Sequence, residues 1–145
     1  MKLKISSPEK VVYEWDVKQV SLPTETGMIT VLPNHIPMVT SLKPWVIKIV
    51  PTESPSWDFI FSENSIQISV GKWMVFVDWK VIRIVTAVAT TSPDSEEVLE
   101  KMKVDLEENI KELKKKWSIE EIEKSIIKLE KINADMKLQR LKKVH

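Results

Sequence analysis

The chain has 145 residues, of which 43% are hydrophobic and 30% are charged, a composition typical of one soluble globular domain with or without an appendage. It contains no cysteine and two histidines, which excludes disulfide bonds and cysteine-ligated metals and disfavours a metal site built from histidine. The net charge of +1 provides no overall field to hold nucleic acid, and we expect neither a membrane span nor a signal peptide.

Residues 1–88 have the pattern of a β-rich domain. Short runs rich in β-branched and aromatic residues alternate with turn residues at roughly 8–12-residue spacing, which predicts a sandwich or a barrel. These runs are residues 11–13, 17–22, 28–32, 46–50, 59–61, 66–70, 74–77 and 81–88. Polar residues alternate with apolar ones over residues 16–22, which indicates a strand with one face in water.

The remainder of the chain predicts helices. All eight prolines lie at or before Pro93, and proline is excluded from helix interiors, so long helices fit only after it. Ser92 and Pro93 predict a helix start, with residues 89–94 as a linker. A second start is predicted at Ser118, which has Glu121 three residues later. Apolar residues recur at spacings of three and four, at positions 99, 102, 106, 110 and 113 and at 119, 122, 126, 129, 132 and 136.

We therefore expect residues 95–145 to form an antiparallel helical hairpin, called the arm below. Residues 93–145 carry 26 charges, most simply read as solvated faces with ion pairs between neighbouring helical turns. The two apolar stripes are too narrow to offset the entropy of ordering about 50 residues. The arm is expected to depend on docking against another surface and to exist in more than one arrangement.

Catalytic motifs are missing from the sequence. It has no glycine-rich phosphate loop, no HExxH and no GxSxG. His35 stands between Pro33 and Pro37, where a structural turn histidine is a better interpretation than a general base. Basic residues gather at the end of the chain, with Asp135 as the nearby acidic residue. They are Lys137, Arg140, Lys142 and Lys143, and they predict either a solvated tail or a contact for an acidic protein.

Tryptophan is in excess and glycine is scarce. The chain has two glycines where about ten would be average, and it has six tryptophans. Trp45, Trp57 and Trp79 stand in expected turns or loops, and Trp117 follows a run of lysines at an expected helix end. Glycine is favoured at such positions because it tolerates positive φ. The alternative is that the tryptophans are platforms for sugars or single-stranded nucleic acid.

Several stretches resemble a known family. Residues 1–5, 7–14 and 20–23 match it. The most specific match is residues 31–44, which read Val-Leu-Pro-Asn-His-Ile-Pro-Met-Val-Thr-Ser-Leu-Lys-Pro. They resemble the ε subunit of bacterial F-type ATP synthase, the equivalent of the mitochondrial δ subunit. The resemblance covers residues 1–88, and the helical hairpin matches by architecture.

The resemblance implies a ten-stranded antiparallel β-sandwich followed by the helical hairpin. It also implies a non-catalytic rotor subunit at the foot of the central stalk, against the γ subunit and the c-ring. Such a subunit is peripheral, on the cytoplasmic face of the bacterial cell membrane, and it couples proton-driven rotation to ATP synthesis. Its arm folds on the sandwich or extends toward the catalytic α and β subunits, where it inhibits ATP hydrolysis.

The resemblance also implies particular contact residues. Met28, at a position where the family usually has glutamate, and His35, which is retained, are the candidates for the c-ring contact. Lys137, Arg140, Lys142 and Lys143 are the candidates for the contact with an acidic segment of the β subunits. Some members bind ATP through an Ile-Asp-x-x-Arg-Ala motif, which residues 119–124 lack, so we expect no ATP site and no cofactor.

Trp15, Trp45 and Trp73 fall where the family typically has glycine. We hypothesise that the gene comes from a lineage that reads UGA as glycine, which the six codons would decide. The alternative function is a sugar- or protein-binding sandwich on a helical stalk, which requires genuine, exposed tryptophans and an export signal. An enzyme that uses His35 is the third hypothesis, and it requires turnover that is lost in His35→Ala.

Overall fold

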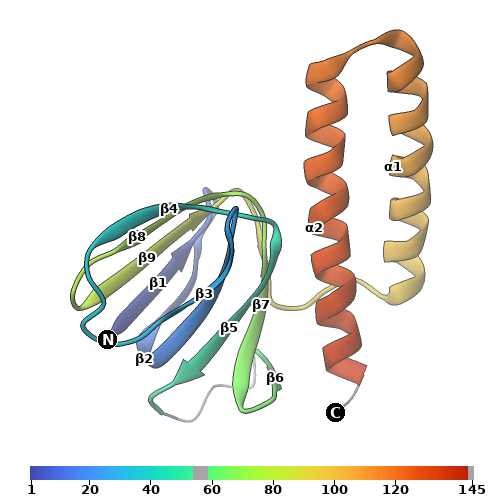
Figure 1. Ribbon diagram of the computed structural model, residues 1–145. Coiled ribbons are helices and arrows are strands. Elements are labelled where there is room, and N and C mark those ends of the chain that lie inside the picture. The colour runs from blue at the N-terminus through green and yellow to red at the C-terminus, as the bar shows by residue number, and fades with distance from the viewer. Residues whose placement is uncertain (54–58, 144–145) are drawn as a thin grey trace.

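The computed structural model describes residues 1–53 and 59–143 (Figure 1). Within these residues the chain forms ten strands and then two helices, as expected. The strands are β1 (Lys2–Ser6), β2 (Val11–Thr24), β3 (Gly27–Val31), β4 (Met38–Leu42), β5 (Trp45–Pro51), β6 (Ile60–Ser62), β7 (Ser65–Val70), β8 (Trp73–Val77), β9 (Val81–Thr86) and β10 (Ala89–Thr90). The helices are α1 (Glu96–Lys116) and α2 (Ile119–Lys143).

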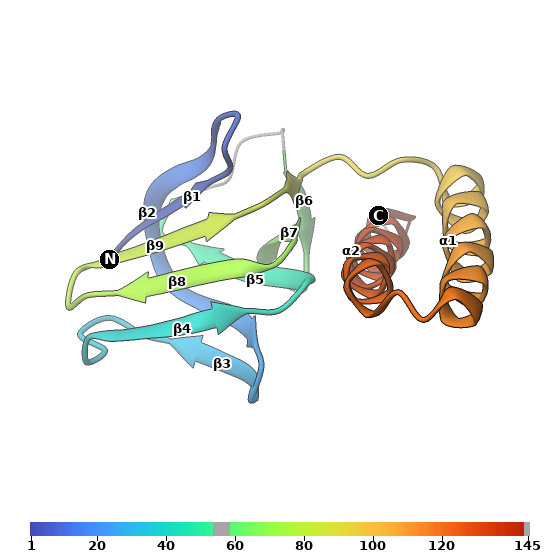
Figure 2. The same ribbon diagram turned by 90° about the horizontal axis from the view of Figure 1, so that it is seen from above.

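The strands form a sandwich in which β2 belongs to both layers. The order is β1-β9-β8-β4-β2-β5-β7-β10, with β3 paired to β2 and β6 paired to β7. The first half of β2 pairs with β1, and its second half pairs with β3 and β5. The pairings are antiparallel except that of β1 with β9, which is parallel. Figures 1 and 2 show the sheet curling over itself.

The core lies between the layers and consists of alternate residues of the strands. Its buried members run from Leu3 to Ile84, and none of them comes from the helices. The alternation slips once in β2, where two polar residues separate the buried Val17 and Val20. The register against β5 shifts between Val17 and Gln19, and such a bulge adds the extra residue. Tyr13 is almost fully buried, and this burial raises its pKa to about 12.

The strand boundaries differ from expectation at a few points. Residues 14–16 were expected between two strands, but they continue β2 because each pairs with a residue of β1. Strands β1 and β4 were not predicted as separate runs. The pair Ala89–Thr90, expected in the linker, forms β10 against the end of β7.

The helical hairpin was predicted correctly, apart from its N-cap. Helix α1 begins at Glu96, because the Ser95 side chain accepts a hydrogen bond from the Val98 N–H at 3.4 Å. Ser92 and Pro93 therefore precede the helix and do not cap it. Helix α2 begins immediately after Ser118, as expected.

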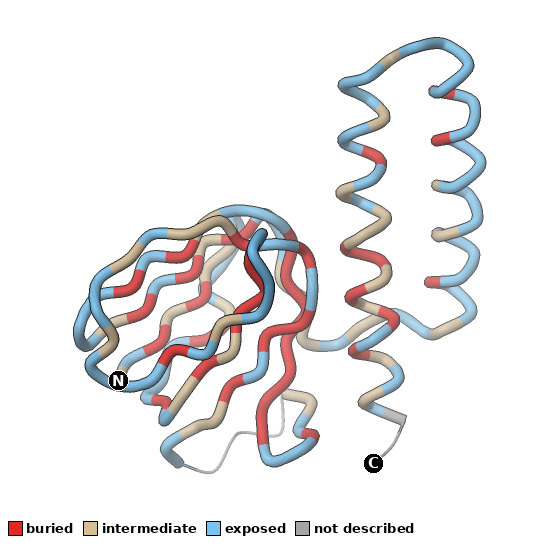
Figure 3. Tube along the Cα trace, viewed as in Figure 1, coloured by how far each residue is buried: buried red, intermediate tan, exposed pale blue. Residues whose placement is uncertain are grey.

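Helix α2 lies between the sandwich and α1, as Figure 2 shows. Leu99 of α1 packs with Ile132 and Met136 of α2 in a small apolar cluster. The other side of α2 contacts β5, β6 and β7. Figure 3 shows that the buried positions of α2 gather in its C-terminal half, beside the sandwich. The arm is thus attached to the sandwich mainly through one end of one helix.

Candidate functional site

The loop between β3 and β4 is a rigid, exposed turn. Asn34 adopts a φ of 67°, the left-handed conformation expected for it. The backbone N–H of His35 donates to the carbonyl of Leu32 at 3.2 Å. The His35 ring is partly buried, and its Nδ1 lies 2.7 Å from the carbonyl oxygen of Ile36, which requires a proton on Nδ1. Ile36 itself is 65% exposed, so this loop presents an apolar surface beside a fixed imidazole.

Met28 lies at the other end of β3 from this loop. It follows Gly27, which belongs to the β2–β3 turn and has a φ of 119°. The Gly27 carbonyl accepts a hydrogen bond from the Thr24 hydroxyl at 2.6 Å. Met28 is 51% exposed. About 10 Å of strand, three residues at ~3.3 Å each, separate Met28 from Val31, and the turn with His35 comes after Val31. The two candidates therefore lie at opposite ends of one strand and not in one cluster.

An apolar groove adjoins the β3–β4 loop on the outer face of β4, β8 and β9. Val39 lies opposite Phe76, and Phe76 lies opposite Arg83, so the three side chains form a row across the strands. The groove has a volume of about 620 Å³, and Pro37, Asp78 and Val81 complete its outer lining. Sequence reasoning missed it, although apolar residues at outward positions of neighbouring strands were an available signal.

The basic residues at the end of α2 remain in solvent. The side chains of Lys137, Arg140 and Lys142 are exposed, while that of Lys143 lies outside the described residues. Asp135 does not neutralise them, because its carboxylate is turned toward the sandwich, where it accepts hydrogen bonds from Lys131 and Ser69. Asp135 therefore does not offset the positive charge at the end of α2, while the acidic first turn of α1, with Glu96 and Glu97, lies beside Gln139 in the same region.

Lys131 and Asp135 form a partly buried ion pair between α2 and the sheet. Lys131 Nζ lies 2.5 Å from Asp135 Oδ1 and 2.9 Å from Thr90 Oγ1, and Ser69 Oγ donates to the same Asp135 oxygen at 2.6 Å. Burial lowers the pKa of Lys131, while the neighbouring Asp135 acts in the opposite direction. The expected ion pairing between neighbouring helical turns is found here, but the pair is largely buried, so the expectation that the arm's charges are solvated is wrong for these two residues. Thr90 lies 41 positions before Lys131, and Ser69 lies 66 positions before Asp135, so these contacts depend on the tertiary fold.

The described tryptophans are all on the surface, with exposures of 54% for Trp15, 39% for Trp45, 59% for Trp73, 51% for Trp79 and 86% for Trp117. Trp117 is the C-cap of α1 and adopts a φ of 57°, as expected for a glycine position. Trp45 and Trp79 are not among the described residues with positive φ, so the turn argument was wrong for both. Trp57 lies outside the described residues.

Replacing Trp117 with glycine is expected to stabilise the arm. A side chain in the left-handed region costs about 1 kcal/mol, which glycine avoids, so unfolding of the helices should need about that much more free energy. Urea titration followed by helical circular dichroism measures it. Trp45→Gly in β5 is the control and should destabilise the chain, since glycine weakens a strand. Equal or lower stability in Trp117→Gly would contradict the prediction.

Neither of the described helices is long and apolar enough to cross a membrane. Over residues 1–53 and 59–143, no three histidine, aspartate or glutamate side chains are grouped so that they could hold a metal ion. The candidate sites described above are the β3–β4 loop with its neighbouring groove, and the basic end of α2.

The chain matches a protein-family model and several proteins of known identity. A family model described as "ATP synthase, Delta/Epsilon chain, beta-sandwich domain" matches residues 1–90. The chain is 31% identical to the ATP synthase epsilon chain of Nitratiruptor sp. over 56% of its own length and 63% of that relative, a little under two thirds. It is 32% identical to the ATP synthase epsilon chain of Rickettsia africae over 74% of its length and 91% of that relative.

A solved structure has the same fold. It is a chain in the cryo-EM structure of the Euglena gracilis mitochondrial ATP synthase, OSCP/F1/c-ring in rotational state 1. The TM-score is 0.69 at 16% identity, and the match covers 99% of this chain and 80% of that one. Sandwich and hairpin together are therefore an arrangement found in a known assembly.

Proposed function

Because the chain belongs to the family of ATP synthase delta/epsilon chains, we propose that it acts as the ε subunit in the central stalk of an F-type ATP synthase. In this role it catalyses no reaction. It transmits rotation of the c-ring toward the catalytic subunits, and its arm restrains ATP hydrolysis. The observation that carries the proposal is the family match over the whole sandwich, followed by a helical hairpin docked on that sandwich.

The sandwich supplies two surfaces for the neighbouring subunits. The β3–β4 loop around His35, together with Met28 at the other end of β3, faces the c-ring. The groove beside Val39 and Phe76 faces the γ subunit. Contiguous exposed apolar residues are characteristic of protein interfaces, and a rigid loop loses little entropy when it binds. The subunit is then peripheral, at the cytoplasmic face of the bacterial cell membrane.

The arm supplies the contact with the catalytic subunits. Its exposed basic residues are not neutralised by Asp135, and a positive surface of this kind fits an acidic segment of the β subunits. The docked arrangement keeps the arm folded down on the sandwich. Extension along the stalk would bring the basic end to the α and β subunits.

The double substitution Met28→Ala and His35→Ala is expected to weaken the coupling of proton flow to ATP synthesis. Neither residue belongs to the buried core, so the sandwich should stay folded. Loss of interface side chains of this kind costs above ~1 kcal/mol at important positions, about fivefold in affinity. Proton-driven ATP synthesis in vesicles measures the effect, with the exposed Val11→Ala as the control. Unchanged coupling in the double variant would reject these residues as the c-ring contact.

A further inference from the structure

The contact between the arm and the sandwich includes a polar strip on β7. Strand β7 is buried along its whole length, because its two faces are covered by different partners. Ile66, Ile68 and Val70 belong to the core of the sandwich. The intervening residues Ser65, Gln67 and Ser69 are equally buried, and α2 packs against β7. On β7 the arm therefore meets small or polar side chains, whereas the core of a permanent interface is mostly apolar.

The ion pair in this contact is carried by the arm. Lys131 and Asp135 are one turn apart on α2, and they pair with each other. The sandwich contributes the neutral hydroxyls of Ser69 and Thr90 to this pair, and its Lys72 lines the same cavity as Lys131 and Asp135. When α2 leaves, the ion pair can remain intact on the helix surface, and the two hydroxyls are hydrated. Breaking a buried ion pair is costly when it leaves one charge buried without its partner. Release of α2 leaves no such charge.

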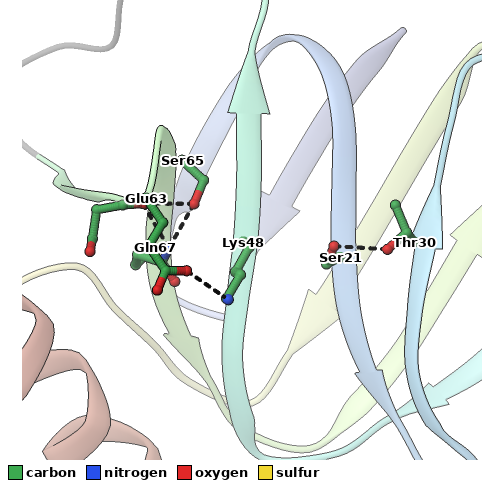
Figure 4. Close-up of polar contacts among 7 residues, drawn as sticks. Ser21, Thr30, Lys48, Glu63, Ser65 and Gln67 are labelled. Carbon is green, nitrogen blue, oxygen red and sulfur yellow. Dashed lines mark hydrogen bonds and ion pairs between the residues drawn. The ribbon is translucent and has the colours of Figure 1, made fainter.

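The polar strip on β7 also includes Gln67. The Gln67 amide nitrogen donates to the carbonyl of Ser62 and to Ser65 Oγ, within the β6–β7 hairpin (Figure 4). Its Oε1 is buried and has no hydrogen-bond partner among the described residues.

We propose that Ser69, Thr90, Lys131 and Asp135 form a polar latch that holds the arm on the sandwich and can open without stranding a charge. In the isolated chain, the latch sets the fraction of molecules whose arm is docked. In the assembled enzyme, it sets how readily the arm becomes free to inhibit, a consequence that rests on the proposed function.

Ser69→Ala tests the latch from the sandwich side, where the change cannot alter the helix itself. The chain has no cysteine, so spin labels can be attached to Lys80→Cys on the sandwich and Lys115→Cys on the arm. Their distance distribution separates docked from released arms. Loss of a hydrogen bond to a charged group should raise the ratio of released to docked arms roughly tenfold or more.

Asp135→Ala provides a second variant, which leaves the Lys131 charge buried without its partner and should release the arm more strongly. Ser21→Ala is the matched control, because it removes a hydroxyl contact of 3.0 Å with Thr30 elsewhere on the sandwich (Figure 4). It should leave the distances unchanged. The latch is overturned if Ser69→Ala and Asp135→Ala both keep the wild-type distribution, or if the wild-type arm is already released in most molecules.

The assembled enzyme separates this inference from the proposed function. If the chain assembles into an ATP synthase, Ser69→Ala should strengthen the inhibition of ATP hydrolysis and Ser21→Ala should not. A variant that releases the arm without changing hydrolysis would remove the regulatory consequence and leave the latch in place. A chain that does not assemble at all would reject the proposed function, whereas the distance measurement on the isolated chain would still decide the latch.

Discussion

An ATP synthase that carries this chain without residues 93–145 is expected to hydrolyse ATP several-fold faster than one that carries the full chain. The arm is the part proposed to extend toward the catalytic subunits, and its removal abolishes that contact in every molecule. The change is larger than any point substitution can produce, because it no longer depends on the balance between docked and extended arms. Steady-state ATP hydrolysis of the assembled enzyme measures it.

The truncated chain should still fold and assemble. The core of the sandwich contains only residues between Leu3 and Ile84, so none of its members is removed. The surface that the arm uncovers on β7 includes Ser65, Gln67 and Ser69, which water can satisfy. Co-purification of the truncated chain with the enzyme is the control. If hydrolysis is no faster although the truncated chain is present, the arm is not an inhibitor in this protein.

Reversing the charge of the basic end of α2 is expected to have a similar, smaller effect with the arm still present. The variant changes Lys137, Arg140, Lys142 and Lys143 to glutamate. Exposed ion pairs contribute up to about 1 kcal/mol each, so the contact amounts to a few kcal/mol at most. That is enough to shift an arm whose states are nearly balanced. ATP hydrolysis should rise and approach that of the truncated enzyme.

Salt dependence gives this prediction a second readout. Exposed charges are screened over about 8–10 Å at physiological ionic strength, so inhibition by the unmodified arm should weaken as salt is added. Lys114, Lys115 and Lys116, which are exposed at the other end of the hairpin, provide the control for charge reversal. Their reversal should leave inhibition unchanged. Equal effects from the two clusters would show that total charge matters and that the end of α2 has no specific contact.

The architecture could be predicted from the sequence because it depends on local patterns. Runs of β-branched and aromatic residues between turns predicted most strands, and the spacing of residues such as Leu99 and Ile132 predicted the hairpin. Strand β4 was not predicted because it is short, Met38–Leu42, and Thr40 and Ser41 interrupt its apolar run. Ser95 caps α1 in place of Ser92, since both are suitable caps and the local sequence offers two starts.

The contacts between distant segments could not be predicted. Ser69 and Asp135 are 66 residues apart, and nothing near either residue indicates the other. The proline-bracketed turn at His35 was evident from the sequence, because prolines restrict the backbone locally. The distance between this turn and Met28 was not evident from the sequence, because that distance depends on where β3 begins and ends. The positive φ of Trp117 was predicted correctly, because the end of a helix imposes a defined conformation. Trp45 begins strand β5, whose extended backbone does not require glycine, so the prediction failed there.

The most direct test of the rotor assignment is to mix the purified chain with an ATP synthase from the same source that has been stripped of its ε subunit, and to determine the cryo-EM structure of the product. The account predicts density for the sandwich at the foot of the central stalk, with the β3–β4 loop on the c-ring and the Val39–Phe76 groove against the γ subunit. An enzyme that leaves the stalk foot empty at saturating concentrations of the folded chain would contradict it.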